Sequence, residues 1–174
     1  MKDSKKSRRR LIGVFLTLAL IVVIVLAAVY IHLSNVLGMT LLESLGTADI
    51  DSVTYGYITP GSVDLNVTWK LTNPTDLSIT VERIVVYFSV DERDIGGVEV
   101  PLNQELPPDG IHHFSMIQSV RDATVLESLN SPTYILRVKQ GSIGGSARYL
   151  FVQTRISKRL GFSRTIEGIP QAKS

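Results

Sequence analysis

A run of 23 residues without one charged side chain, residues 11–33, constrains this chain more than any other feature. As a helix rising about 1.5 Å per residue, it would cross a hydrocarbon layer of about 30 Å. A cleaved secretory signal usually has an apolar region of about 7 to 15 residues that ends in small residues. Here the run is longer, and Ala27 and Ala28 are followed by Val29 and Tyr30. The sequence therefore predicts an uncleaved signal anchor that spans the lipid bilayer.

The charges on either side of this run predict its orientation. Residues 1–10 hold six basic residues and one acidic residue, whereas the rest of the chain holds 12 basic and 15 acidic residues. Because basic residues next to a span stay in the cytoplasm, we expect a cytoplasmic tail at 1–10 and an extracytoplasmic remainder at the cell membrane. An acidic remainder argues against a nucleic-acid partner, which would require a basic folded surface.

The segment that follows the span, residues 34–51, has apolar residues at roughly helical spacing. Gly46 is expected to end this helix. We interpret the segment as a juxtamembrane connector, a stalk that lies outside the core of the following domain.

From residue 50 the hydrophobic period changes to two, which is typical of strands with one buried face. Residues 64–72 alternate most clearly, and residues 122–130 predict one short helix with Asp122 as its cap. The glycine-rich residues 141–145 are expected to form a hairpin before a strand at 147–156. Six or seven strands in 52–169 predict a mainly β fold, a fibronectin-III- or immunoglobulin-like antiparallel sandwich, followed by a tail at 170–174.

The pair Asn73-Pro74 predicts a structural turn after the strand at 64–72. Proline has no N–H to give to a sheet, and the asparagine side chain hydrogen-bonds readily to nearby backbone.

The region Val67 to Val90, VTWKLTNPTDLSITVERIVVYFSV, resembles the late embryogenesis abundant group 2 (LEA-2) domain, also called the water stress and hypersensitive response (WHy) domain. There a strand ends in Asn-Pro and a second strand follows at once. The similarity extends over roughly 50–169 and includes the turn 106–110. It implies a fibronectin-III-like sandwich behind one N-terminal span, a link to desiccation or osmotic stress response, and no catalytic residues.

Candidate chemistry is scarce in this sequence. It has no cysteine and three histidines, two of which, His112 and His113, are adjacent in a predicted strand and so face opposite sides. No P-loop, dinucleotide-binding or hydrolase motif is present. We therefore predict no catalytic residue, no cofactor and no metal site, and a protein that is not an enzyme.

Two surface features are candidates for contacts. Residues 34–136 hold four basic and 14 acidic residues, whereas 137–174 hold eight basic and one acidic. Arg155, Lys158 and Arg159 could contact an anionic lipid surface or an acidic partner, although pairing with acidic neighbouring strands is the favoured alternative. Asn66 begins an Asn-Val-Thr sequon, a possible glycosylation site if the domain is extracytoplasmic.

Together these features predict a non-enzymatic, membrane-anchored, extracytoplasmic binding or protective module that partners the bilayer through residues 11–33. An envelope protein or another copy of the chain are the partners considered. The alternative function is a structural subunit of a surface filament or of an archaellum- or pilus-type envelope assembly, in which sandwich edges would pair between copies.

Overall fold

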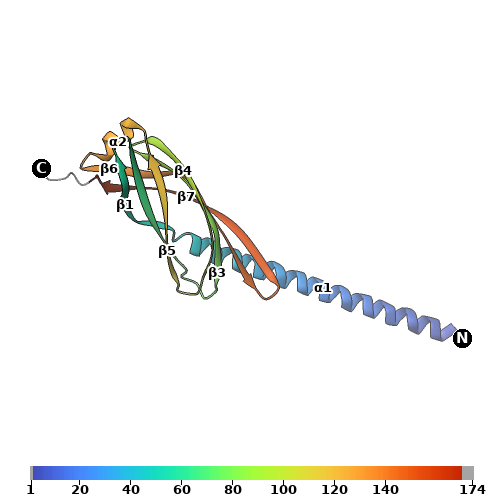
Figure 1. Ribbon diagram of the computed structural model, residues 1–174. Helices are drawn as coiled ribbons and strands as arrows, with labels where there is room; N and C mark the ends of the chain where they lie inside the picture. The colour runs from blue at the N-terminus through green and yellow to red at the C-terminus, as the bar shows by residue number, and fades with distance from the viewer. Residues whose placement is uncertain (1, 170–174) are drawn as a thin grey trace.

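The structure, a computed structural model, describes residues 2–169, with side chains from residue 13 onward, so the predicted tail at 170–174 lies outside the described residues. Two helices and seven strands follow one another in the order α1 (Lys2–Leu45), β1 (Asp49–Thr59), β2 (Ser62–Thr72), β3 (Ile79–Val90), β4 (Arg93–Leu106), β5 (Ile111–Val120), α2 (Ala123–Leu129), β6 (Thr133–Tyr149) and β7 (Val152–Glu167). Figure 1 shows α1 projecting from one end of the β body.

The strands form two antiparallel sheets. Three strands are ordered β1-β2-β5 and four are ordered β4-β3-β6-β7. Inward residues of both sheets meet in one core around Trp69, whose ring stacks on Phe114 at 6.1 Å and meets Phe162 edge-on at 5.4 Å. The predicted mainly β sandwich with one short helix is confirmed.

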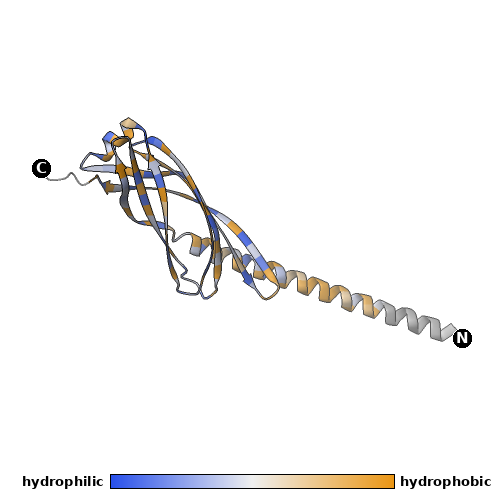
Figure 2. Ribbon diagram, viewed as in Figure 1, coloured by the Kyte–Doolittle hydropathy of each residue, from blue (hydrophilic) through white to orange (hydrophobic). Residues whose placement is uncertain are grey.

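Helix α1 has an exposed part and a buried part. By length and composition, residues 13–45 form a helix that could cross a membrane. Apolar side chains from Val14 to Tyr30 are exposed, and Figure 2 shows this part of α1 as a continuous hydrophobic rod outside the body. No part of the described body covers this surface.

The end of α1 packs into the body, which differs from the expected stalk at 34–51. Leu37, Leu41 and Leu45, spaced by four residues, are at most 1% exposed and belong to the main core. They lie against the inner face of β6 and β7. Because an i, i+4 row forms one face of a helix, these leucines turn the expected connector into part of the core.

The predicted hairpin at residues 141–145 is wrong. Strand β6 runs through these residues without a turn, and the β6–β7 hairpin lies at 150–151, inside the strand expected at 147–156. The glycines serve close packing instead. A Cβ on Gly145 would lie 2.9 Å from the Thr80 carbonyl oxygen and 3.2 Å from a methyl carbon of Leu45. Gly145 thus lets α1 approach the sheet.

Three further local features have an explanation in the sequence, and one of them, the predicted Asp122 cap of α2, is confirmed. The register of β3 shifts between Val81 and Arg83, where the alternation of apolar residues slips. Strand β4, which contains Pro101, is an edge strand. The carboxylate of Asp122 accepts hydrogen bonds from the backbone N–H groups of Thr124 and Val125 at the start of α2.

Candidate functional site

The junction between α1 and the body is the most extensively bonded polar region outside the sheets, and it centres on Asn73. This side chain is completely buried. Its Nδ2 group donates to the carbonyl oxygens of Leu77 at 2.8 Å, Pro107 at 3.0 Å and Leu106 at 3.1 Å. Asn73 lies in the connection between β2 and β3, and its side chain joins this connection to the one between β4 and β5.

The same asparagine also holds the end of α1. Its Oδ1 atom accepts hydrogen bonds of 2.7 Å from the hydroxyls of Ser44 and Thr75. Three residues after Ser44, the Thr47 hydroxyl donates to the Thr72 carbonyl oxygen at 2.6 Å and accepts from the Thr72 N–H at 2.8 Å. One buried amide thus connects the long helix to two loops of the sandwich, because an amide both donates and accepts.

Sequence reasoning missed Ser44 and Thr47, since both fell in the expected connector. A serine on the same helical turn as buried leucines is the only local signal that pointed to the junction. Neither hydroxyl could be assigned a partner without knowing that α1 returns to the turn after β2.

Strand β7 runs beside α1 in a fixed register. Three contacts follow one another along the two elements: the hydroxyls of Ser34 and Thr154 lie 3.2 Å apart, a Cβ on Gly38 would lie 3.4 Å from Ile156 Cδ1, and Lys158 Nζ donates to the Leu42 carbonyl oxygen at 3.3 Å. Each step is four residues in the helix and two in the strand. These steps match, since four helical residues rise about 6 Å and two strand residues about 6.6 Å.

The three candidate basic residues on β7 are not brought to one face. Lys158 lies on the inner face against the last turns of α1. Its positive charge is favourable there because the carbonyl end of a helix carries a partial negative charge. Arg155 and Arg159, at odd positions of the strand, lie on the outer face. Arg155 Nε pairs with a Glu82 carboxylate oxygen at 3.1 Å. An anionic-surface contact by these residues stays a prediction.

Pairing between basic and acidic strands, the favoured alternative, is present elsewhere in the four-stranded sheet. Lys139 on β6 lies 2.6 Å from Asp94, and Arg137 lies 3.9 Å from Glu92 at the β3–β4 loop. All four side chains are well exposed, so each pair contributes at most about 1 kcal/mol.

Asn66 lies on the outer face of β2, the central strand of the three-stranded sheet. The side chain is half-buried, and its Oδ1 atom is buried without a hydrogen-bond partner. Glycosylation of this residue stays a prediction.

Within residues 13–169 no group of three or more His, Cys, Asp or Glu side chains could hold a metal ion. His113 Nδ1 on β5 lies 3.4 Å from an Asp51 carboxylate oxygen on β1, across the intervening strand β2, and the two form a single exposed pair. No nucleophile-and-base constellation accompanies it in the described part of the chain.

An open groove of about 700 Å³ lies between the edge strands β1 and β7. At one end of it the Tyr55 hydroxyl donates to the Glu167 carbonyl oxygen at 2.5 Å and lies 3.2 Å from the Tyr134 hydroxyl. Burial raises the pKa of both phenols above their ordinary value of about 10. The pair links the two sheets and offers neutral hydroxyls only.

We expect this tyrosine pair to make the fold sensitive to alkali. A phenol whose pKa is raised by folding stabilises the protein below about pH 10, and this contribution is lost as the pH rises through the raised value. Urea unfolding of the full chain in detergent at about pH 9 and about pH 11 would show a fall in the free energy of unfolding. Tyr55→Phe with Tyr134→Phe should reduce that fall, whereas Tyr57→Phe, at a side chain that is 75% exposed, should leave it unchanged.

Comparison with known proteins identifies related folds but no family. No protein-family model matches the chain, and no curated protein matches it significantly. The X-ray structure of the structural genomics target SoR45 has a TM-score of 0.50 at 9% identity, covering 75% of this chain and 93% of that one. It shares the fold of the body.

Two further solved structures are similar to a lesser degree. One is a protein from Arabidopsis thaliana, with a TM-score of 0.49 and 18% identity over 69% of this chain and 80% of that one. The other is described as a candidate late embryogenesis abundant (LEA) protein, with a TM-score of 0.43 and 17% identity over 83% of this chain and 91% of that one.

Proposed function

We propose that the chain is a non-enzymatic module that α1 anchors in the cell membrane, with residues 1–10 in the cytoplasm and the sandwich on the opposite side. The observation that carries this proposal is the exposed apolar surface of α1. Within its apolar window no residue is buried, although the mean hydropathy is 3.1. Such a surface is costly in water and favourable in lipid. The basic residues before it support the orientation.

The rigid junction supports a role in which the body is held in one position relative to α1, and therefore at a fixed distance from the membrane. Asn73, Ser44 and the buried leucines of α1 allow the helix little freedom to swing relative to the sandwich. A protein that protects an envelope component or binds a partner there benefits from a fixed height and orientation. The resemblance of residues 67–90 to the LEA-2/WHy domain, and the LEA protein among the similar structures, support protection during water stress as the class of role.

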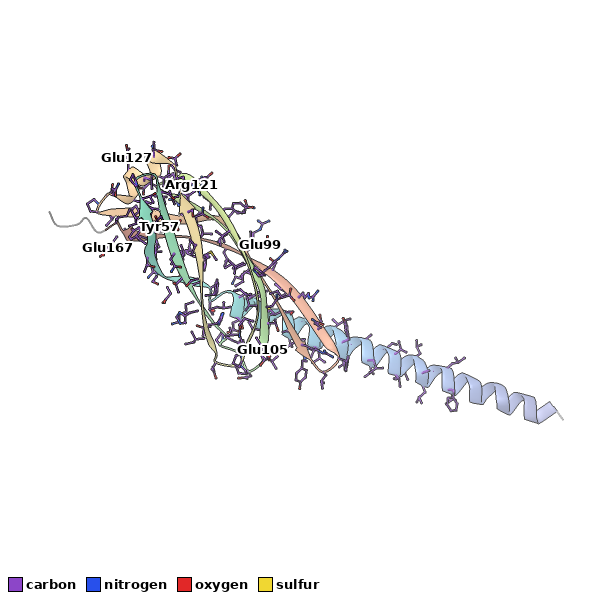
Figure 3. All side chains as sticks on the ribbon, in the orientation of Figure 1. Tyr57, Glu99, Glu105, Arg121, Glu127 and Glu167 are labelled. Carbon is purple, nitrogen blue, oxygen red and sulfur yellow. The ribbon has the colours of Figure 1, made fainter. Side chains whose placement is uncertain are left out.

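Cysteine labelling tests the anchoring and orientation, because the natural sequence has no cysteine. We expect a membrane-impermeant maleimide to label Tyr57→Cys in intact cells and to label Ser4→Cys only after the membrane is permeabilised. Figure 3 places Tyr57 at the end of the body away from α1. Labelling of Ser4→Cys alone in intact cells would reverse the proposed orientation, and recovery of the chain in the soluble fraction would refute the anchor.

Crosslinking of the full-length protein in its membrane separates this role from the filament subunit. We expect monomers or adducts to one distinct envelope protein. A regular ladder of self-adducts would instead favour the structural assembly, in which the edges of β1, β4, β5 or β7 pair between copies.

A further inference from the structure

The loop between β6 and β7 is unlike the other hairpin loops of the described chain. Tyr149 pairs with Val152, so the loop consists of Leu150 and Phe151 alone. Their side chains are 68% and 63% exposed, and Tyr149 is 44% exposed. The loops of the other hairpins, at 60–61 and 91–92, carry proline, glycine or charged residues, and so does the connection between the two sheets at 107–110. We call Tyr149, Leu150 and Phe151 the hairpin tip.

The residue preferences of tight turns do not explain why leucine and phenylalanine occupy the hairpin tip. Leu150 has a φ of +54°, a conformation that glycine, asparagine and aspartate adopt far more readily than leucine. A polar or small residue would therefore suit both the backbone and an aqueous surface better. The hairpin tip combines an unfavourable backbone with exposed apolar side chains, which indicates that its residues have a partner outside the body.

The register of β7 against α1 shows at what height the hairpin tip lies. The contacts of Thr154, Ile156 and Lys158 with α1 repeat every four helical residues. One further step of the same size brings Val152 level with Tyr30. The hairpin tip lies beyond Val152, beside the last two turns of the predicted span at 11–33. Figure 1 shows this hairpin running along α1 toward the N-terminus, past the other strand ends on that side of the body.

The position of the hairpin tip along α1 coincides with the expected edge of the bilayer. A hydrocarbon layer of about 30 Å takes about 20 helical residues, which places its far boundary near Tyr30 if it starts at Leu11. Aromatic side chains are favoured at that boundary. Immediately above the hairpin tip, Arg148 and Gln153 face each other across the strands and are exposed, and no acidic side chain of the described residues pairs with Arg148. On moving outward from the centre of the bilayer, the apolar hairpin tip therefore comes first and the Arg148 cation second. This is also the order of the hydrocarbon layer and the lipid phosphates.

We propose that the hairpin tip inserts into the leaflet beside α1 and forms a second membrane attachment, with Arg148 at the level of the lipid phosphates. The proposal rests on the anchoring by α1 proposed above. Although the junction fixes the body to α1, a single span can still rotate and tilt in the bilayer together with the body, whereas a helix and a neighbouring hairpin tip fix which side of the sandwich faces the membrane. Lipid is the occupant because the hairpin tip is continuous with the exposed apolar surface of α1.

Depth-dependent fluorescence quenching of the full chain in phosphatidylcholine vesicles tests this insertion. Single-cysteine variants Phe151→Cys, Tyr57→Cys and Leu20→Cys would each carry an environment-sensitive fluorophore. We expect quenchers attached to lipid chains to reduce the emission of the Phe151→Cys and Leu20→Cys probes several-fold more than that of the Tyr57→Cys probe, and aqueous iodide to show the reverse order. Emission of the buried Trp69 confirms that each variant is folded.

The Leu20→Cys probe separates the two proposals. Lipid quenching at Leu20→Cys with iodide quenching at Phe151→Cys would overturn insertion of the hairpin tip and leave the anchor intact. Iodide quenching at both positions would overturn both. Contact between Phe151→Cys probes of different copies, seen as self-quenching that disappears on dilution in lipid, would assign the hairpin tip to self-association and also overturn the proposal.

A charge in the loop provides a second test. Leu150→Asp introduces a residue that tolerates the positive φ at this position, so the fold should be preserved. Combined with the Phe151→Cys probe, it should lower lipid quenching and raise iodide quenching. Ile58→Asp, at an apolar side chain that is 51% exposed on β1, is the matched control and should change neither. Unchanged quenching in the Leu150→Asp variant would contradict insertion.

Discussion

Asn73→Ala is expected to destabilise the full chain by about 3 kcal/mol. The substitution removes one buried amide and leaves the carbonyl oxygens of Leu77, Leu106 and Pro107 without that donor and the Ser44 hydroxyl without its acceptor. Each buried polar group left without a partner costs about 1 to 3 kcal/mol, and part of this cost is recovered if water enters. Urea unfolding in detergent, followed by the emission of Trp69, measures the difference.

Two further variants distinguish the hydrogen bonds from the volume of the side chain. Asn73→Asp keeps the shape but directs a carboxylate toward three carbonyl oxygens, so we expect a loss at least as large as for alanine. Asn66→Ala changes the same residue type within β2, the strand that ends just before Asn73. The Oδ1 atom of Asn66 has no partner, and the substitution should cost less than about 1 kcal/mol. Equal effects of Asn66→Ala and Asn73→Ala would contradict the central role of Asn73.

Leu41→Ala is expected to cost about 3 kcal/mol, because it leaves a cavity between α1 and the sheet. The Leu41 side chain is completely buried, between Leu37 and Leu45 on the inner face of β6 and β7. The same unfolding experiment measures this loss. If residues 34–51 formed a stalk outside the core, Leu41→Ala would cause almost no loss of stability.

Leu42→Ala is the matched control, since Leu42 is the next residue of the same helix and its side chain is 40% exposed. We expect this variant to cost less than about 1 kcal/mol. If both leucines gave the same small change, α1 would contribute to the membrane span only and the packed junction would be refuted.

The sequence predicted the elements that repeat a local pattern. The alternation at 64–72 predicted β2, and Asp122 predicted the start of α2. These features depend on neighbours within a few residues, so a local reading is sufficient. The Asn73-Pro74 turn was predicted for the same reason.

Two expectations failed where local signals were ambiguous. Glycines at 141–145 resemble a turn, but here they permit close approach of α1 and β3. Leu150 and Phe151 resemble strand residues, but they form a turn. In both cases the reason for the residue type is a neighbouring element beside the strand. The spacing of residues along the sequence gives no information about that neighbour.

For this chain, the sequence by itself determined an apolar helix long enough to span a membrane, its basic flank, a β-sandwich body and the Asn-Pro turn. Each of these features depends on composition or on a pattern that repeats every few residues. Only the tertiary structure decided that Ser44 bonds to Asn73, that Ser34 lies against Thr154, and that the hairpin tip lies beside the end of the apolar run at 11–33. These contacts join residues 29 and 120 positions apart in the chain. Such pairs are selected by the packing of whole elements, and that packing depends on the shape of every surface that meets.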